Sequence, residues 1–437
     1  MKKLFIITFL FIACQAFPQR LSGIKLTQTL CREMALKNSE DMQKQTNVLH
    51  QAMLDKDIAR ASYFPDIDAT VMDVFTKDNK LSETSKLQMK GTYMAGISLS
   101  LPIYAGGRIT TGNKLADIGV EVQKIQSEKT RRDIIYNADK AFYTFLATRS
   151  KVDVIKSYII QMDSLMAMTK RSVDVEMATN SDLLRIDSKR SQMEYNLNKA
   201  MNGVELCRMS LCAVLGVDIN TPIEIDDSEL KSLTSLEDDC ITGGTAGNIT
   251  ERPEYQLLLQ NIKVKELEIK QARASYLPTF ALSAQYSKYG WAYIKGNVDG
   301  YSYKSEIKGD MPVLMATLSI PLWHWGKEIK GVKKAKLSLE NAKLDLKKNE
   351  RLLNIQNHQV KQNVEDSYRM ISTAVKAFVQ AEDNLHNMQL RYDNSMATLT
   401  DLLDAHSQKT EAMSNVIEAR TQYMIYRSEY EKLVEGF

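Results

Sequence analysis

The sequence has few cysteines and few histidines, the side chains that most often hold transition metals in proteins. Its 437 residues contain five of each. Cys207 and Cys212 are five positions apart on a predicted helix, and the other cysteines stand alone, so neither a zinc site nor a dense disulfide framework is indicated. The dispersed histidines are His50, His324, His358, His386 and His406. Because no nucleophile-base arrangement stands out either, we expect no enzymatic activity, no metal site and no cofactor.

Charge of one sign and long apolar segments are also scarce. The formal net charge is only +3, which gives no electrostatic case for nucleic acid as a partner. After the amino-terminal leader, no run reaches the ~18 apolar residues that a membrane-spanning helix needs. If the protein crosses a membrane, we therefore expect strands to do so.

Residues 1–19 are predicted to be a secretory signal peptide. Lys2 and Lys3 precede the apolar run from Leu4 to Ala13, and small residues follow around Ala16. The mature chain should therefore leave the cytoplasm. Lipidation of Cys14 is an open alternative, although the residues before it fit a lipidation box poorly.

Proline is rare, and its distribution predicts two very long helices. The eight prolines leave 103–221 and 322–437 uninterrupted, and each proline after the leader is expected at an element boundary. We predict helices over about 104–175 and 326–394, each followed by a shorter antiparallel partner over about 181–214 and 400–435. Globular helices average roughly 11–12 residues, so these are expected to be coiled-coil-like.

The sequence contains two copies of one repeat. Leu99-Ser100-Leu101-Pro102-Ile103-Tyr104 recurs as Leu318-Ser319-Ile320-Pro321-Leu322-Trp323, 219 positions later. Arg60-Ala61-Ser62-Tyr63-Phe64-Pro65 recurs as Arg273-Ala274-Ser275-Tyr276-Leu277-Pro278, 213 positions later. The change in offset indicates a loop insertion between strands. We predict tandem structural repeats over 20–216 and 253–437, joined by an irregular connector over 217–252.

Each repeat is predicted to contain one β-hairpin, giving four strands over about 66–76, 91–102, 279–289 and 313–321. Their residues alternate between an apolar face and a small polar face, which suits a transmembrane barrel with lipid outside and water inside. Four strands cannot enclose a lumen, because about eight only just accommodate side chains. A barrel would therefore need several copies of the chain. The alternative is a soluble sandwich in which the apolar face packs on another sheet.

Aromatic residues stand at the same point of both repeats, where the second strand of each hairpin ends. They are Tyr104, Trp323 and Trp325. This placement favours an aromatic belt at a membrane interface over ordinary packing.

The duplicated strand-Pro-x-aromatic junctions, the Arg-Ala-Ser-Tyr-x-Pro hairpin entries and the Thr400 to Ala405 turn together resemble the TolC-type outer membrane efflux protein family. The resemblance covers essentially the whole mature chain. It implies a mainly α homotrimer: a twelve-stranded transmembrane barrel in outer membrane lipid, continued by a long periplasmic α-helical barrel. It also implies a periplasmic adaptor and an inner membrane pump as partners, and a passive exit duct as the function.

The resemblance further implies a constriction at the periplasmic mouth. Asp401 and Asp404 match the family's mouth carboxylates, and Asp182 and Tyr392 match residues that help to hold the mouth closed. Three-fold symmetry would gather carboxylates around the axis, where like charge should raise some pKa values. For Asp182 and Asp401 the alternative is a helix N-cap. The helix tips expected to contact the adaptor are Met177, Ala178, Thr179, Met396, Ala397 and Thr398.

The sequence departs from the family pattern at the two helix turns. Glu176 and Ser395 stand where the family commonly has glycine, and Ala397 stands where some members have a basic residue that helps to close the mouth. Closure therefore need not use the same contacts. The competing hypothesis for the whole chain is a secreted coiled-coil scaffold or adaptor without a pore.

Overall fold

The computed structural model describes residues 25–80, 88–225, 248–291, 294–298, 300–305 and 308–435. The predicted signal peptide and most of the predicted connector lie outside these residues. The first half of the described chain contains β1 (Lys25–Leu26), α1 (Gln28–Asn38), α2 (Glu40–Ala61), β2 (Asp66–Lys80), β3 (Gln88–Ala105), α3 (Arg108–Asp174), α4 (Asn180–Val214) and β4 (Glu224–Ile225).

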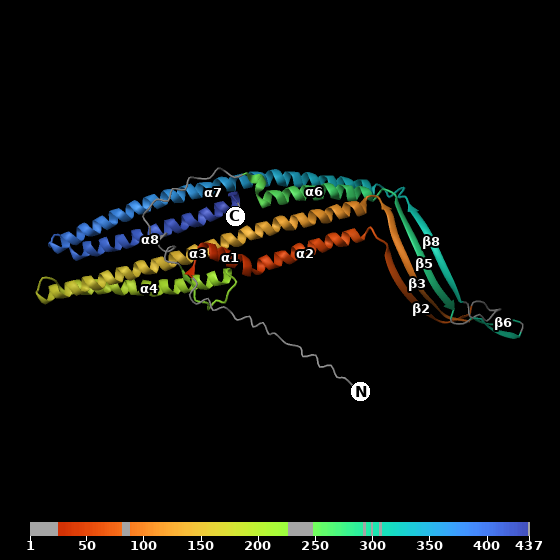
Figure 1. Ribbon diagram of the computed structural model, residues 1–437, viewed down its shortest axis with the longest axis horizontal. Coiled ribbons are helices and arrows are strands. Elements are labelled where there is room, and N and C mark those ends of the chain that lie inside the picture. Colours follow the sequence, from red (N-terminus) through yellow and green to blue (C-terminus); the bar gives the residue numbers. More distant parts are fainter. Residues whose placement is uncertain are drawn as a thin grey trace, which may run out of the picture. The chain divides into compact units, whose positions relative to one another are not determined.

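The second half repeats much of this order, and its elements can be followed by colour in Figure 1. It contains the 3₁₀ helix η1 (Ile249–Glu251), α6 (Pro253–Ala274), β5 (Thr279–Trp291), β6 (Ile294–Val298), β7 (Tyr301–Ser305), β8 (Lys308–Ser319), α7 (Lys327–Asp393), α8 (Leu399–Tyr430) and the π-helical turn η2 (Glu431–Glu435).

Corresponding helices of the two repeats have equal lengths. Helices α3 and α7 are each 67 residues long and begin 219 positions apart, at Arg108 and Lys327. Helices α2 and α6 are each 22 residues long and begin 213 positions apart, at Glu40 and Pro253. At ~1.5 Å per residue, α3 and α7 are each about 100 Å long.

The chain divides into two compact units. Unit 1 comprises residues 1–40, 131–247 and 357–437, and unit 2 comprises residues 41–130 and 248–356. None of the described helices is both long and apolar enough to cross a membrane.

Unit 2 contains an antiparallel sheet whose four long strands lie side by side in the order β2, β3, β5, β8 (Figure 1). Ile67 pairs with Leu99, Leu99 with Ala284, and Ala284 with Leu314. The expectation of four strands was too low, because the described residues also contain the β6·β7 hairpin and the two-residue pair β1·β4. The β6·β7 hairpin lies in the segment where the repeat offset changes.

Pairing in register gives the sheet two unlike faces. One face is apolar and largely exposed, with Leu314 at 82% exposure and Val71 at 81%. The opposite face carries small polar residues such as Ser98, Ser283 and Gln285. Four methionines also share this polar face, which the alternation of small residues did not lead us to expect. They are Met72, Met94, Met311 and Met315.

Two prolines lie within strands and not at element boundaries, contrary to our expectation. Pro102 pairs with Ala281 next to a register shift in β3, and Pro312 pairs with Tyr286 in β8. Proline has no N–H to donate, so it is tolerated at bulges and on edge strands. Both positions meet that condition, since β8 is an edge of the sheet within one chain.

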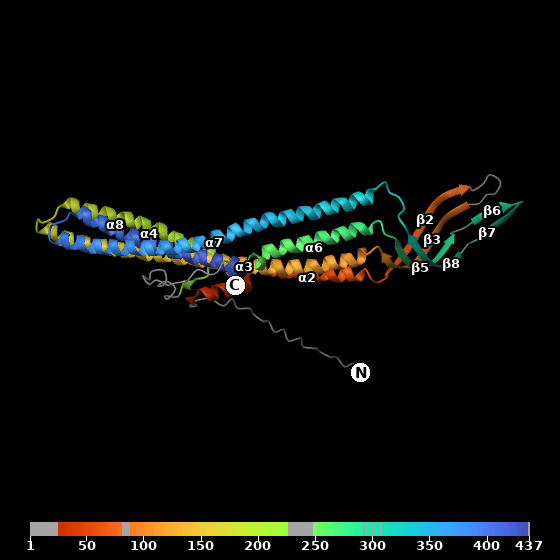
Figure 2. The same cartoon turned by 90° about the horizontal axis from the view of Figure 1, so that it is seen from above.

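In unit 1 the helices lie side by side in the order α4, α3, α8, α7, and the two views of Figures 1 and 2 agree on their parallel course. Arg190 of α4 pairs with Asp163 of α3 at 2.5 Å. Gln161 of α3 bonds His406 of α8 at 3.0 Å, and Lys409 of α8 pairs with Glu382 of α7 at 2.8 Å. Helix α8 therefore contacts both α3 and α7, and near the turns Arg185 of α4 also reaches it.

Candidate functional site

The two turns that join the long helices to their partners have the same backbone. Turn A comprises residues 175–179 and turn B comprises residues 394–398. Glu176 and Ser395, 219 positions apart, have φ values of 62° and 58°, in the left-handed region that favours glycine. In both turns the next amide bonds back to the helix, from Met177 to Ser172 and from Met396 to Arg391. The turn is therefore built without the glycine that the family commonly uses.

A capping box follows each turn. The hydroxyl of Thr179 accepts from the amide of Asp182, and the Asp182 carboxylate accepts from the Thr179 amide at 3.1 Å and hydroxyl at 2.8 Å. Thr398 and Asp401 repeat the arrangement. The threonines are the N-caps and the aspartates occupy the third helical position, which differs from the simple cap considered for Asp182 and Asp401. The hydrogen bonds from Thr398 lower the pKa of Asp401.

The other proposed mouth residues lie close to turn B. Asp404 is exposed one turn beyond the capping box. Tyr392 packs against a group of buried residues that we call the tip cluster. Within the described residues no hydrogen bond joins Tyr392 to Asp182. The tip cluster comprises Tyr158, Met162, Leu165, Ile186, Leu385, Leu399, Leu402, Leu403 and Ala405.

The expected adaptor-contacting residues form the ends of the two turns. Met177 and Met396 are exposed, as are Thr179 and Thr398, and Ala178 and Ala397 are half-buried. Two exposed methionines in equivalent places give each turn a flexible apolar end.

A polar contact between the repeats lies beside the turns. The guanidinium of Arg185 on α4 donates to the Thr400 hydroxyl on α8 at 3.0 Å. Arg185 was not among the predicted site residues. Comparing positions 219 apart could have found it, because Arg185 is the counterpart of Asp404 and therefore reverses the charge at that place.

A buried histidine lies one turn further along α8. His406 is 8% exposed and its Nδ1 lies 3.0 Å from Gln161 Oε1. The ring makes an edge contact with Tyr158 at a centroid distance of 6.3 Å. Burial, followed by the positive charge of Lys409, lowers the pKa of His406 to about 4. The imidazole is therefore neutral at ordinary pH.

This histidine should make the unfolding free energy depend on pH. Its folded pKa lies below its ordinary value of 6.5, so the unfolded chain binds more protons between pH 6.5 and 4. Stability should fall as pH falls through that window, by up to about 3 kcal/mol, and this contribution should level off below pH 4. We expect His406→Gln to flatten the slope when denaturation is measured at pH 7 and pH 4. An unchanged slope would contradict the assignment.

At the other end of unit 1, a polar network that we call the N-terminal clasp holds α1 against α3 and the end of α8. The side chain of Asp139 is fully buried and accepts from Arg32 Nε at 2.8 Å and from the other Arg32 nitrogen at 2.6 Å. Ser428 Oγ donates at 2.5 Å and Gln28 Nε2 at 3.3 Å to the same carboxylate. Arg32 also pairs with Glu431 at 3.2 Å. Together these contacts satisfy a carboxylate that has no access to water.

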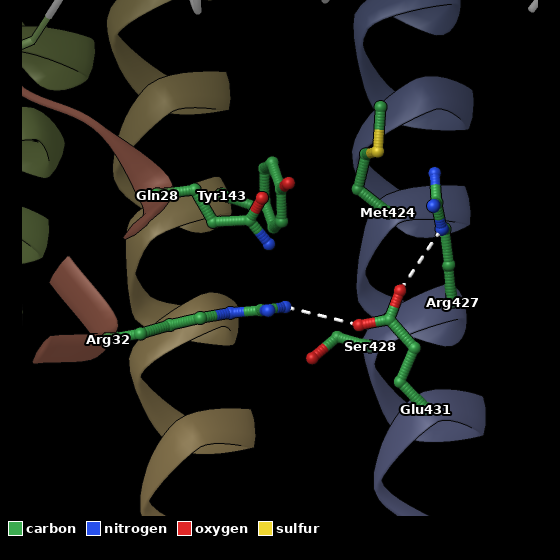
Figure 3. A pocket seen from close by; sticks show the side chains of 7 residues that line it. All are labelled: Gln28, Arg32, Tyr143, Met424, Arg427, Ser428 and Glu431. Carbon is green, nitrogen blue, oxygen red and sulfur yellow. Dashed lines mark hydrogen bonds and ion pairs between the residues drawn. The ribbon is translucent and has the colours of Figure 1, made fainter. Parts of the chain in front are cut away.

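Figure 3 shows the cavity that this clasp borders. Arg32 reaches from α1 toward Glu431, which also accepts from Arg427 at 3.2 Å. The cavity holds about 200 Å³. The neighbouring Cys31 thiol is buried, and burial raises its pKa to about 12, so it is not a reactive thiolate. The charged residues around the cavity, Arg32, Arg427 and Glu431, are paired with one another, as expected of a structural network.

The predicted interface aromatics lie at the junctions between sheet and helix in unit 2. Tyr104 is near the end of β3, and Trp323 and Trp325 follow β8, with ring centroids 6.1 Å apart. All three are exposed. Trp325 has a φ of 55° at the position equivalent to Gly106, whose φ is 62°. The left-handed turn into the long helix is therefore kept in both repeats, and one repeat places an indole there.

Among the described residues, no group of histidine, cysteine, aspartate or glutamate side chains has the geometry of a metal site. Cys31, Cys207 and Cys212 are free thiols.

The sequence matches a known protein family. The model of the family described as "Outer membrane efflux protein" matches residues 31–217 and 249–430. No curated protein matches the sequence.

Several solved structures share the fold. CusC is 11% identical with a TM-score of 0.77, covering 95% of this chain and 96% of that chain. The CmeC outer membrane channel of Campylobacter jejuni is 16% identical with a TM-score of 0.75, covering 95% and 89%. The outer membrane protein VceC of Vibrio cholerae is 13% identical with a TM-score of 0.74, covering 94% and 96%. Because the family model matches most of both repeats, the chain belongs to the outer membrane efflux protein family.

Proposed function

We propose that three copies of the chain form a passive exit channel in the outer membrane. The four long strands of each copy contribute to one twelve-stranded barrel, and the four long helices of each copy contribute to one twelve-helix barrel in the periplasm. The observation that carries this proposal is the pair of sheet edges for which the described residues of one chain provide no partner strand.

Those edges belong to β2 and β8. Among the described residues, β2 pairs only with β3 and β8 pairs only with β5, although these strands are 15 and 12 residues long. In lipid, an open edge would leave its backbone groups without hydrogen-bond partners. Pairing β8 of one copy with β2 of the next satisfies both edges. Closure after three copies gives a barrel wide enough for a water-filled lumen.

The helices of unit 1 support the same assembly independently. Leu403 on α8 is 4% exposed because it lies in the tip cluster, which includes residues of α3, whereas its counterpart Leu184 on α4 is 70% exposed. The same difference separates buried Ile417 from exposed Asn198. Helix α4 therefore carries a surface that its copy buries. A neighbouring subunit that places α7 against α4 would cover it as α3 covers α8.

The two faces of the sheet suit the proposed environment. The apolar face would contact lipid, and Asp73, Lys288 and Asp310 mark its outer limit, where Tyr286 donates to Asp310 at 3.1 Å. At the opposite limit, Tyr104, Trp323 and Trp325 would lie at the interface, which aromatic side chains favour. The polar face, with its serines and methionines, would line the lumen.

Turns A and B would form the periplasmic end of the channel and would contact an adaptor protein through Met177, Met396 and the residues beside them. Exposed methionines suit such a contact because their side chains adapt to different surfaces. An inner membrane pump would then supply cargo through the adaptor.

The proposal is tested with the purified full-length chain. We expect a trimer that resists dissociation in sodium dodecyl sulfate without heating, and discrete single-channel conductance in planar bilayers. A soluble monomer without conductance would contradict the channel and favour a secreted coiled-coil scaffold or adaptor.

Asp401 and Asp404 are proposed to narrow the periplasmic mouth, together with Asp182 and Tyr392. Asp401 and Asp404 are three residues apart on one side of α8, so three copies would bring them around the axis. Replacing both with alanine should raise single-channel conductance and weaken block by divalent or trivalent cations. Unchanged block by hexaamminecobalt(III) would show that these carboxylates do not line the mouth.

A further inference from the structure

The charge at one level of the helix tips differs between the repeats. Arg185 on α4 and Asp404 on α8 are 219 positions apart, as are Ser181 on α4 and Thr400 on α8. Some nearby pairs keep their charge at the same offset, although Asp187 and Lys189 match His406 and Gln408. Asp182 matches Asp401, and the ion pair of Arg190 with Asp163 matches that of Lys409 with Glu382. Between residues 179 and 193, Arg185 and Asp404 form the pair whose charges have opposite signs.

The contact of Arg185 defines a geometric relation between neighbouring helical hairpins. Arg185 reaches from the first hairpin, α3·α4, to Thr400 of the second hairpin, α7·α8, at 3.0 Å. In the proposed trimer, the second hairpin has the first hairpin of the next copy as its other neighbour. Because the hairpins are repeats of one unit, the same relation places Asp404 beside Ser181 of the partner subunit. A carboxylate can accept a hydrogen bond from a serine hydroxyl there.

We infer that Arg185 is a selectivity-determining residue of the periplasmic mouth, alternating with Asp404 in a six-membered ring of opposite charges. The inference rests on the proposed trimeric channel and refines its mouth. Three guanidinium groups and three carboxylates give this ring no net formal charge. The Asp182 and Asp401 level, three residues nearer the turns, keeps its negative charge.

The ring has two separable consequences. Arg185 supplies positive charge that opposes entry of cations, and its bond to Thr400 ties the two hairpins of one chain together. Arg185→Gln removes the charge, and Thr400→Val removes only the acceptor. Lys170→Gln is the matched control, because Lys170 is an exposed cation near the same end of α3.

The experiment measures block of single channels by hexaamminecobalt(III) together with the reversal potential in a salt gradient. We expect Arg185→Gln to lower the half-blocking concentration about fivefold, the effect of roughly one unit-charge contact in water, and to raise cation selectivity. Thr400→Val should alter conductance while leaving selectivity at the wild-type value. Lys170→Gln should leave both near wild type.

A charge-exchange variant keeps the test informative if a single substitution prevents assembly. Arg185→Asp combined with Asp404→Arg keeps the ring neutral and should restore wild-type block, whereas Arg185→Asp alone should tighten block beyond Arg185→Gln. Block that is equal in the wild type, Arg185→Gln and the exchanged variant would overturn the inference while leaving the channel intact. Absence of conductance from the wild type would instead overturn the proposed function.

Discussion

Replacing Ile97 with aspartate should abolish assembly into the outer membrane. Ile97 lies at the centre of the apolar face, between Ala69 on β2 and Tyr286 on β5, and is exposed within one chain. A carboxylate on the lipid face near the bilayer centre is destabilising, although by less than the roughly 2–4 kcal/mol per chain that lysine or arginine costs there, and three copies multiply the penalty. We expect the variant to be lost from outer membrane fractions and to give no unheated trimer on gels.

The matched control is Ser98→Asp, one residue away on the opposite face. Ser98 pairs with Asp68 and Gln285, so its side chain belongs to the polar face that we assign to the lumen. This variant should assemble and conduct. If both aspartates prevented assembly equally, the assignment of the faces would fail. If neither did, lipid would not contact the apolar face.

The second large effect concerns the N-terminal clasp. Arg32→Ala should lower the free energy of unfolding by about 3–5 kcal/mol, because it leaves the fully buried Asp139 carboxylate without its cation. Ser428 and Gln28 would remain as donors, but neither carries charge. The shift is measured as the change in guanidinium chloride midpoint of the full-length protein, followed by circular dichroism.

Two further variants separate burial from charge. Lys151→Ala removes an exposed cation that pairs with Glu418 at 2.9 Å, and should cost less than about 1 kcal/mol. Arg32→Leu combined with Asp139→Leu removes both charges of the pair and should recover much of the loss. A loss from Arg32→Ala no larger than that from Lys151→Ala would contradict the structural importance of the clasp.

Features that depend on local pattern could be predicted from the sequence. The proline-free stretches indicated the long helices, whose observed bounds of Arg108–Asp174 and Lys327–Asp393 lie near the predicted 104–175 and 326–394. Strand alternation indicated the two faces of the sheet. The family resemblance was confirmed by the family model.

Features that depend on distant partners could not be predicted. Arg32 and Asp139 are 107 positions apart, and Ser428 lies 289 positions beyond Asp139, so no local signal joins them. Helices α1 and α2 are separated at Ser39, whose amide closes α1 by bonding to Ala35, and the contacts that hold α1 against Asp139 span more than 100 positions.

The equal length of α3 and α7 constrains how the protein can be redesigned. Removing seven residues from α3 alone would withdraw turn A by about 10 Å while turn B stayed in place. Every viable change of length must therefore occur in all four long helices at once. An engineer who deletes matched heptads from α3, α4, α7 and α8 could shorten the assembly in steps of about 10 Å and leave its strands untouched.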